Sequence, residues 1–314
     1  MSNFIVKQEG PSPRVAEKVL EVRLGTGSLL IGALAGTLAG LYLGRRGAQE
    51  DLATDPKNWP ANFAHRGGAG IAPENTLKAF REALSIGAGV LELDVHTTAD
   101  GHVVVIHDDV VDRTTEGTGP VREKTLAELK RLDAGYEFSL DGRRTFPCRD
   151  QGIRIPTLVE VYDEFVEVPI NIEIKGKRSG IEAAVWRVIE AADAEERTLV
   201  VSENMHTIRR FREVSGGRVA TASSSVELIH FKILSSLGLG RFVRPRYRAL
   251  QGPETYRGLR VVTPGLIRAA HERGLRVDVW TIDSEADMRR LLGYGVDGIM
   301  TDRPDILAGV LQGP

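Results

Sequence analysis

Acidic side chains stand inside short stretches that are otherwise apolar. Glu92 and Asp94 lie two residues apart in one such stretch, and Glu173 lies in another. Alternate residues of a strand point to the same face, so Glu92 and Asp94 would share one. Three carboxylates brought together repel one another, and burial without a cation would raise their pKa values. A hard divalent cation, Mg²⁺ or Ca²⁺, relieves this repulsion, and the sequence therefore predicts a site for one such ion at these three residues.

Two histidines, each beside a charged residue, add groups that can move protons. His65 precedes Arg66, and His107 precedes Asp108. The unperturbed imidazole pKa of about 6.5 lets one histidine accept a proton while another donates one. Arg66 can hold a phosphate through its two-pronged guanidinium, and Lys175 adds a second positive charge. These residues predict phosphate ester chemistry, with His65 and His107 as the acid and base.

A structural cluster of salt bridges is the alternative to a metal site. Lys175 shares a strand face with Glu173, and with Arg66 it could neutralise the carboxylates without a metal. For any one of these residues alone the salt bridge would be the better interpretation, but the whole set at the strand ends favours the metal. No catalytic part is predicted for the other histidines, which are His96, His102, His206, His230 and His271.

Eight short apolar stretches, alternating with amphipathic helical ones, must position these side chains. This alternation predicts parallel strands with helical crossovers, and the length suits a single (β/α)₈ TIM barrel. The predicted strands are Asn62–Arg66, Val90–Thr97, Ile170–Lys175, Thr198–Glu203, Arg218–Ser223, Ala249–Gly252, Arg276–Ile282 and Asp297–Thr301. The predicted helices are Thr76–Ile86, Ile181–Ala192, Thr207–Val214, Pro264–Arg273 and Glu285–Leu292. The polar residues named above, and Trp280, lie at or near the carboxyl ends of the strands, where such barrels carry their active sites.

One more strand, Val103–His107, follows the second barrel strand too closely for a parallel crossover. The two must therefore be antiparallel, and Asp100-Gly101 is a preferred dipeptide for a two-residue hairpin turn. A turn centred there pairs Asp94 with His107 on one face of the hairpin.

Residues 110–156 form the longest stretch without a clear barrel strand. They include a predicted helix, Leu126–Leu132, and loops rich in Gly, Thr, Asp and Arg. An insertion at this point of the chain is interpreted as a cap over the barrel mouth.

The N-terminal part differs in composition from the rest. Leu24–Gly44 contains no charged residue, and at about 1.5 Å per residue it would span roughly 30 Å, the thickness of a bilayer core. The predicted organisation is an N-terminal segment (1–23), a transmembrane helix (24–44), a linker (45–60) and the barrel (61–314). A signal peptide or a buried soluble helix is the alternative, but about twenty residues with several glutamates precede the segment. The sequence thus predicts a single-pass membrane anchor of undetermined orientation.

Small residues recur at every fourth position of this segment. They are Ser28, Gly32, Gly36, Gly40 and Gly44. Such a face lets two transmembrane helices approach closely, which predicts a homodimer through this helix.

The net charge and the cysteine content bear on two further questions, nucleic-acid binding and disulfide bonds. The formal net charge is -2, so no strong basic excess points to a nucleic-acid partner. Cys148 is the single cysteine, so the fold does not depend on an internal disulfide.

The motifs that hold the candidate residues resemble those of the glycerophosphodiester phosphodiesterase family. They occur in family order from about residue 62 to 307. The matching stretches are His65-Arg66-Gly67, Pro73-Glu74-Asn75-Thr76, Glu92-Leu93-Asp94-Val95, His107-Asp108, Arg113-Thr114-Thr115, Ile155-Pro156-Thr157-Leu158, Glu173-Ile174-Lys175, Trp280-Thr281, Gly295-Val296-Asp297-Gly298-Ile299 and Thr301-Asp302.

The resemblance implies a barrel of the phosphatidylinositol-phospholipase C-like type. It implies that His65 and His107 are the acid/base pair, that Glu92, Asp94 and Glu173 bind the metal, and that Arg66 and Lys175 hold the phosphate. It further implies attack by the substrate's own 2-hydroxyl, giving a cyclic phosphate that water opens, and a place for Trp280 in the substrate pocket. The products would be glycerol 3-phosphate and an alcohol. One residue departs from the family pattern: Asp283 stands where the family often has Asn, which would alter contacts near the leaving group.

Three functions other than the hydrolysis of soluble glycerophosphodiesters are alternatives for this sequence. A membrane-anchored lysophospholipase D, releasing lysophosphatidic acid, would share the mechanism. It would give the apolar stretch Leu228–Leu239 a role at an acyl groove or a bilayer, although a helix that packs on the barrel is the better interpretation of that stretch. An inactive barrel that only binds ligands is disfavoured by the complete set of reactive residues. A sphingomyelinase D-like enzyme is disfavoured by the Pro-Glu-Asn-Thr stretch and the long insertion.

Overall fold

The computed structural model describes residues 59, 61–175 and 180–313. The transmembrane helix predicted at Leu24–Gly44, with its small-residue face, lies outside these residues, and so does nearly all of the predicted linker. Within the described ranges, no helix is both long enough and apolar enough to cross a membrane.

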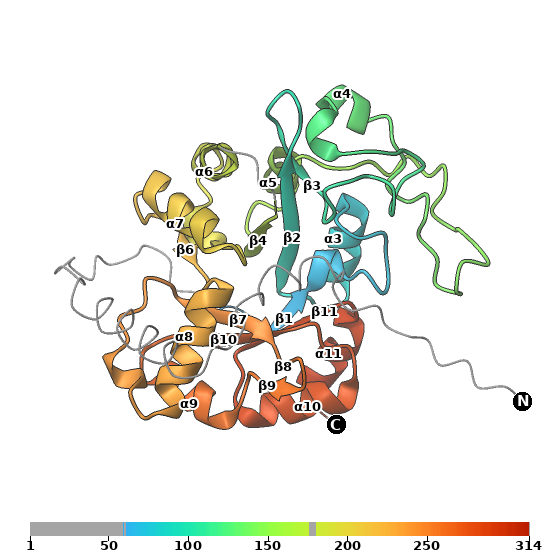
Figure 1. Ribbon diagram of the computed structural model, residues 1–314. Helices are drawn as coiled ribbons and strands as arrows, with labels where there is room; N and C mark the ends of the chain where they lie inside the picture. The colour runs from blue at the N-terminus through green and yellow to red at the C-terminus, as the bar shows by residue number, and fades with distance from the viewer. Residues whose placement is uncertain (1–58, 60, 176–179, 314) are drawn as a thin grey trace, which may run out of the picture. The chain divides into compact units, whose positions relative to one another are not determined.

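Eight parallel strands form a nearly closed barrel with helices on its outside (Figure 1). The barrel strands are β1 (Asn62–Ala64), β2 (Val90–Thr97), β4 (Ile170–Ile174), β5 (Thr198–Val201), β6 (Ala220–Thr221), β7 (Ala249–Pro253), β10 (Arg276–Trp280) and β11 (Gly298–Thr301). Their order around the barrel is β6-β5-β4-β2-β1-β11-β10-β7. The last gap, between β6 and β7, is bridged by hydrogen bonds from Arg248 N–H to Thr221 O (2.8 Å) and from Ser223 N–H to Ala249 O (2.9 Å).

All eight predicted barrel strands are therefore confirmed, most of them shorter than predicted. The first was predicted to reach Arg66, but β1 ends at Ala64 and the chain turns into a short 3₁₀ helix, η2 (His65–Gly67). Arg66 has a φ of 52°, in the left-handed region, which is incompatible with a strand.

Helices follow most of the barrel strands and cover the outside of the barrel. They are α3 (Leu77–Ser85), α5 (Leu158–Glu164), α6 (Ile181–Ala191), α7 (Met205–Val214), α8 (Ser225–Ser236), α9 (Pro264–His271), α10 (Glu285–Tyr294) and α11 (Pro304–Leu311). One further helix, α4 (Leu126–Leu129), lies in the insertion 110–156. Short 3₁₀ helices are η3 (Val121–Glu123), η4 (Glu195–Arg197) and η5 (Gly240–Phe242). Side-chain caps explain where several helices begin: Thr76 accepts a hydrogen bond from Ala79 N–H before α3, and Thr263 does so from Leu266 N–H before α9.

The helices α5 and α11 were not predicted. The first had a recognisable signal, because Thr157 and Glu160 form a reciprocal capping box at its start. The segments that form α5 and α11 are short, and the apolar residues of such short segments fit a strand as well as a helix.

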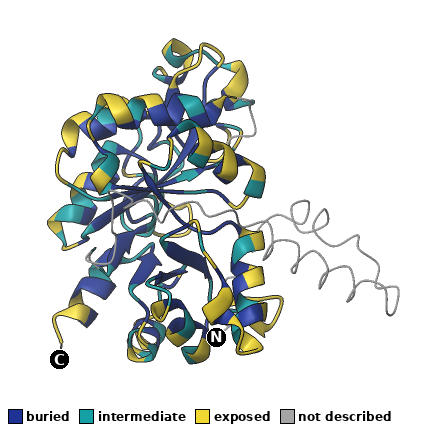
Figure 2. Ribbon diagram, turned by 90° about the vertical axis from the view of Figure 1, so that its left-hand side faces the viewer, coloured by how far each residue is buried: buried dark blue, intermediate teal, exposed yellow. Residues whose placement is uncertain are grey.

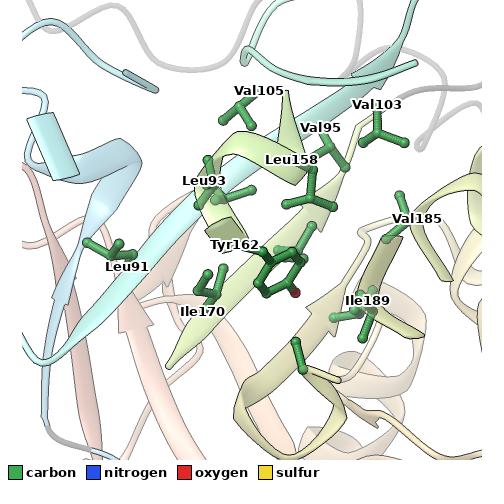
Figure 3. Close-up of a cluster of buried hydrophobic side chains, with 14 of the residues drawn as sticks. Leu91, Leu93, Val95, Val103, Val105, Leu158, Tyr162, Ile170, Val185 and Ile189 are labelled. Atoms are coloured by element: carbon green, nitrogen blue, oxygen red, sulfur yellow. The ribbon is translucent and has the colours of Figure 1, made fainter. Parts of the chain in front are cut away.

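Apolar side chains fill the space between the strands and the helices. One core cluster lies around β2, β4 and α5 and includes Leu93, Ile170 and Tyr162 (Figure 3). A second cluster lies under α8, α9 and α10. Figure 2 shows the barrel strands mostly buried, while the helices are buried on the side that faces the barrel and exposed on the other. A short antiparallel pair outside the barrel, β8 (Thr255–Tyr256) and β9 (Leu259–Arg260), is exposed.

Truncation of a buried aromatic side chain should measure how strongly this core stabilises the fold. Phe211 of α7 is fully buried in the first cluster. Phe211→Ala removes most of its apolar surface and leaves a cavity, and we expect the free energy of unfolding to fall by about 3–5 kcal/mol in urea titration. Val166→Ala, at a side chain that is 65% exposed, should change it by less than about 0.5 kcal/mol. Equal effects of the two substitutions would contradict this account of the core.

The predicted cap insertion has a small core of its own. Its apolar residues pack with the neighbouring strand β3 (Val103–Val105) and include Val111, Leu129, Cys148 and Ile155. The helix predicted at Leu126–Leu132 is α4, which ends earlier, at Leu129. Cys148 is buried in this cluster, where it acts as an apolar side chain.

The predicted register of the hairpin is wrong by one residue. β2 and β3 are antiparallel, as predicted, but Val95 pairs with Val105 and Thr97 with Val103. Thr98 N–H donates to His102 O at 3.0 Å, so the loop has three residues and ends at Gly101, whose φ is +87°. A three-residue loop with a left-handed last residue is a common alternative to the two-residue turn. Asp94 therefore lies opposite Ile106, which donates its N–H to Asp94 O at 2.9 Å, and not opposite His107.

Candidate active site

The three predicted metal ligands lie together at the mouth of the barrel. Asp94 of β2 pairs in register with Glu173 of β4, and Glu92 is two residues before Asp94 on the same face. Each of the three offers one carboxylate oxygen, and these oxygens lie within 4.8 Å of one another. Glu92 and Asp94 are almost fully buried, whereas Glu173 is partly exposed. The parallel pairing of two neighbouring strands is thus what brings these residues together.

Two cations and one amide hold the Asp94 side chain. Lys175 Nζ lies 3.5 Å from Asp94 Oδ1 and 2.8 Å from Glu173 Oε2, and Arg66 Nε lies 3.4 Å from Asp94 Oδ2. Asn75 Nδ2 donates to Asp94 Oδ2 at 3.0 Å. Burial alone would raise the pKa of Asp94, but Lys175, Arg66 and the other positive groups outweigh it and lower that pKa.

The negative charges of Glu92 and Glu173 are less well balanced by nearby positive groups than that of Asp94. Burial raises the pKa of both, and the Asp94 carboxylate raises it further. Glu92 accepts a hydrogen bond from Arg66 N–H at 2.8 Å, and within the described ranges no cationic side chain other than a histidine pairs with it. Two cations among three carboxylates leave negative charge that a divalent ion would neutralise, and all three ligands are the oxygen donors that Mg²⁺ and Ca²⁺ prefer. The residues present therefore fit such an ion better than they fit a closed salt-bridge cluster.

His65 is oriented by a carboxylate from the other end of the chain. Its Nδ1 lies 2.6 Å from Asp302 Oδ1, in the loop after β11. Asp302 is held in turn by Asp283, whose Oδ1 accepts a hydrogen bond from Asp302 N–H at 2.8 Å and from Thr301 Oγ1 at 2.9 Å. Burial alone would lower the pKa of His65, but the bond to Asp302 and the negative charge of Glu92 raise it. A proton on Nδ1, shared with Asp302, leaves Nε2 available to a substrate.

His107 has an equivalent arrangement on the other side of the site. Its Nδ1 lies 2.6 Å from Asp108 Oδ1, and Arg113 Nε donates to Asp108 Oδ2 at 2.7 Å. Arg113 also binds Glu74 at 2.7 Å through both terminal nitrogens, and Glu74 accepts from Arg66 at 3.1 Å. Although the register is not the one predicted, His107 lies beyond the end of β3, close enough to Asp94 to contribute to lowering the pKa of that carboxyl.

Several supporting residues of this site were quoted in motifs but given no role. Asn75 has a φ of 56°, which aims its amide at Asp94, and Asp302, Asp108, Glu74 and Arg113 orient the reactive groups. The sequence signal was the acidic residue beside His107 and the acidic residue after the last strand. Asp283 accepts hydrogen bonds from the Thr301 hydroxyl and from Asp302 N–H, and its effect on contacts near the leaving group stays a prediction.

Trp280 and His96 lie beside the site but not among its charged groups. Trp280, at the end of β10, is partly buried and packs against Phe63, Val90 and Met300. No contact among the described residues joins it to the carboxylates, so its place in the substrate pocket stays a prediction. His96, for which no catalytic part was predicted, lies within hydrogen-bond distance of His107 O, with Nε2 at 3.0 Å.

Asp302 should affect turnover through the orientation of His65. Asp302→Asn keeps the shape of the side chain but removes the charge that holds a proton on Nδ1. We expect kcat to fall by about 10- to 10⁴-fold, the upper figure being the cost of the same change behind the histidine of a Ser-His-Asp triad, without a change in the thermal unfolding midpoint. Asp305→Asn is a matched control, because Asp305 lies three residues further on, in the first turn of α11, and pairs with Arg303. Unchanged kcat in Asp302→Asn would show that His65 needs no such partner.

Comparison with known proteins places this site in a family. The model of the Glycerophosphoryl diester phosphodiesterase family matches residues 65–306. A Glycerophosphodiester phosphodiesterase of Caldanaerobacter subterraneus subsp. tengcongensis is 37% identical over 80% of this chain and 97% of its own. Lysophospholipase D GDPD1 of Mus musculus is 30% identical over 80% of this chain and 86% of its own.

Solved structures agree with the sequence comparison. A phosphodiesterase of Oleispira antarctica, in complex with the product sn-glycerol-3-phosphate, superposes with a TM-score of 0.66 at 26% identity, over 81% of this chain and 98% of that one. The family match covers more than half of the chain and includes all the candidate residues. The chain therefore belongs to the glycerophosphoryl diester phosphodiesterase family.

Proposed function

We propose that this phosphoric diester hydrolase cleaves glycerophosphodiesters to glycerol 3-phosphate and an alcohol, using one divalent cation. The observation that carries the proposal is the site itself: two histidines, each with Nδ1 on a carboxylate, beside three clustered carboxylates. The name of the Caldanaerobacter relative and the product bound to the Oleispira structure support the substrate class.

Each residue has a role that its surroundings support. Glu92, Asp94 and Glu173 would hold Mg²⁺ or Ca²⁺, which supplies positive charge to the phosphate oxygens. Arg66 and Lys175 would bind the same phosphate group at its other oxygens.

The two imidazoles would carry the protons. One would take the proton of the attacking hydroxyl through Nε2, and the other would give a proton to the leaving oxygen. Their Nδ1 atoms stay on Asp302 and Asp108, so that each ring presents only Nε2 to the substrate. The attacking group would be the 2-hydroxyl of the glycerol, which expels the alcohol and forms a cyclic phosphate. Water would then open this ring to give glycerol 3-phosphate, and Trp280 would line the pocket.

A lysophospholipase D activity is the second candidate. The relative from Mus musculus bears this name, and α8 exposes apolar side chains to solvent. The test compares choline release from glycerophosphocholine and from lysophosphatidylcholine by the purified chain with Mg²⁺ or Ca²⁺. Faster release from glycerophosphocholine supports the first candidate, faster release from the lysolipid supports the second, and release from neither refutes both.

We also propose that Leu24–Gly44 anchors the protein in a membrane and pairs two copies through its small residues. The uncharged length of this segment supports the proposal. Alkaline carbonate should fail to extract the full chain from membranes. Extraction of the full chain as completely as of a variant that lacks residues 24–44 would contradict the anchor, and absence of crosslinked dimers would contradict the pairing.

A further inference from the structure

The helix α8 and the segment after it carry an exposed apolar surface on the outside of the barrel. Twelve large apolar side chains are exposed in the described part of the chain, and six of them belong to α8 and the segment after it. These six, each 42% to 66% exposed, are Val226, Ile229, Ile233, Leu237, Leu239 and Phe242. We call them the α8 patch. A cluster of this kind is unusual on a soluble surface, where single exposed apolar residues are normal.

The helix α8 is apolar on two opposite faces. Leu228, Phe231 and Leu234 pack into the core under the helix. Val226, Ile229, Ile233 and Leu237 follow one another at spacings of three and four residues, which places them on the outer face. A helix that only packs on a barrel needs one apolar face and carries polar residues on the other. The outer face therefore requires a second explanation.

Positive charge follows this helix in the sequence. Residues 228–253 contain no Asp or Glu, and their basic residues are Lys232, Arg241, Arg244, Arg246 and Arg248. The acidic residues on either side are already paired, Glu227 with Arg212 and Glu254 with Arg290. Among the described residues, the exposed Arg241, Arg244 and Arg246 form no ion pair, although Arg241 lies over the Phe242 ring.

We propose that the α8 patch is a docking surface for an anionic phospholipid bilayer. Leu, Ile and Phe side chains on one helix face insert at the boundary between headgroups and acyl chains, and arginines beside them bind the negative headgroups. A second copy of this chain fits the patch poorly, because a two-fold contact would bring together two surfaces of the same positive charge and neutralise neither. The chain's own apolar segment Leu24–Gly44 carries no charge and would leave the arginines unneutralised.

The position of α8 relates this surface to the active site. The helix begins shortly after the carboxyl end of β6, so its first turn, with Val226, lies near the end of the barrel that carries the site, and Leu237 lies toward the opposite end. The stripe between them is about 16 Å long at the usual rise per residue. α8 lies between α7 and α9 (Figure 1), so the barrel would rest on the lipid along its wall while the mouth stays open.

A fluorescent label placed on the α8 patch tests this proposal in the full chain. It reports lipid contact at the patch itself, separately from any membrane binding by residues 24–44. Cys148, which is buried, is replaced by Ala, and an environment-sensitive label is attached at Ile233→Cys or, as a control, at the exposed Val166→Cys in the loop between α5 and β4. The protein is titrated with vesicles of phosphatidylcholine, with or without phosphatidylglycerol. A lipid that carries a nitroxide reports direct contact by quenching.

We expect the label at position 233, and not the one at 166, to shift to the blue and to be quenched on vesicles that contain phosphatidylglycerol. Replacing Arg241, Arg244 and Arg246 together by Gln should weaken this response about a hundredfold in lipid concentration. The same change at three distant exposed arginines, Arg122, Arg131 and Arg144, should not.

Three outcomes would overturn the proposal. They are no response at 233, an equal response on pure phosphatidylcholine, and a blue shift at 233 without vesicles, which would mean that protein covers the patch. None of these readings depends on turnover, so a failure here is separate from a failure of the proposed phosphodiesterase activity.

Discussion

Replacing either active-site histidine with alanine should lower kcat roughly 10²- to 10⁴-fold, the usual contribution of a positioned acid or base. His65 and His107 each bind a carboxylate through Nδ1, so each ring can exchange a proton with substrate only through Nε2. Their loss removes that exchange without removing core apolar surface. The measurement is turnover of glycerophosphocholine by His65→Ala and His107→Ala, with folding checked by circular dichroism.

A second substrate tells the acid from the base. A 4-nitrophenyl diester releases a stable anion that needs no proton from the protein, so the variant that lacks the acid should lose much less activity on it. The variant that lacks the base should lose as much as before. His206→Ala is the control, because His206 is exposed on α7. Full turnover in either active-site variant would refute the assigned roles.

Removal of the divalent cation should abolish turnover, and this is the second large effect. Burial and mutual repulsion raise the pKa values of Glu92 and Glu173, which leaves the cluster in need of positive charge beyond Lys175 and Arg66. A chelator should therefore inactivate the protein, and Mg²⁺ or Ca²⁺ should restore it. Binding of the ion should also stabilise the fold, by about 2.7 kcal/mol at a hundredfold excess over Kd.

Glu173→Gln is the cleaner variant for this test. Asp94 also holds Lys175 and Arg66, so Asp94→Asn would disturb two ion pairs as well as the metal. Glu173→Gln should lose most of the calorimetric heat of metal binding, along with the thermal stabilisation by metal. Glu285→Gln, at an exposed glutamate that pairs with Arg289, should keep both. Full activity after chelation would instead support the salt-bridge alternative.

Most of the fold could be predicted because the barrel repeats one local pattern. Each barrel strand is a short apolar run, and turn and cap residues separate it from the next helix. Glu92 and Asp94 share a face by strand geometry alone, and the parallel pairing of β2 with β4 adds Glu173. The three carboxylates were thus found from spacing and from the order of the strands.

The hairpin shows where local reasoning failed. Asp100-Gly101 fits a two-residue turn, yet the loop includes Ala99 as well. Turn length sets register, and a shift of one residue moves every side chain to the other face. Competing turn types differ little in local preference, so packing of the whole hairpin decides between them.

The sequence by itself determined the barrel strands, the clustering of the three carboxylates and the family. Only the tertiary structure decided how the histidines are held, because His65 and Asp302 are 237 residues apart and meet only where β1 pairs with β11. The ion pairs that link Arg66 to Glu74, and Glu74 to Arg113, likewise join loops from different parts of the barrel mouth. The physical reason is that periodicity reports which face a side chain occupies, whereas contacts between distant loops depend on how the barrel closes.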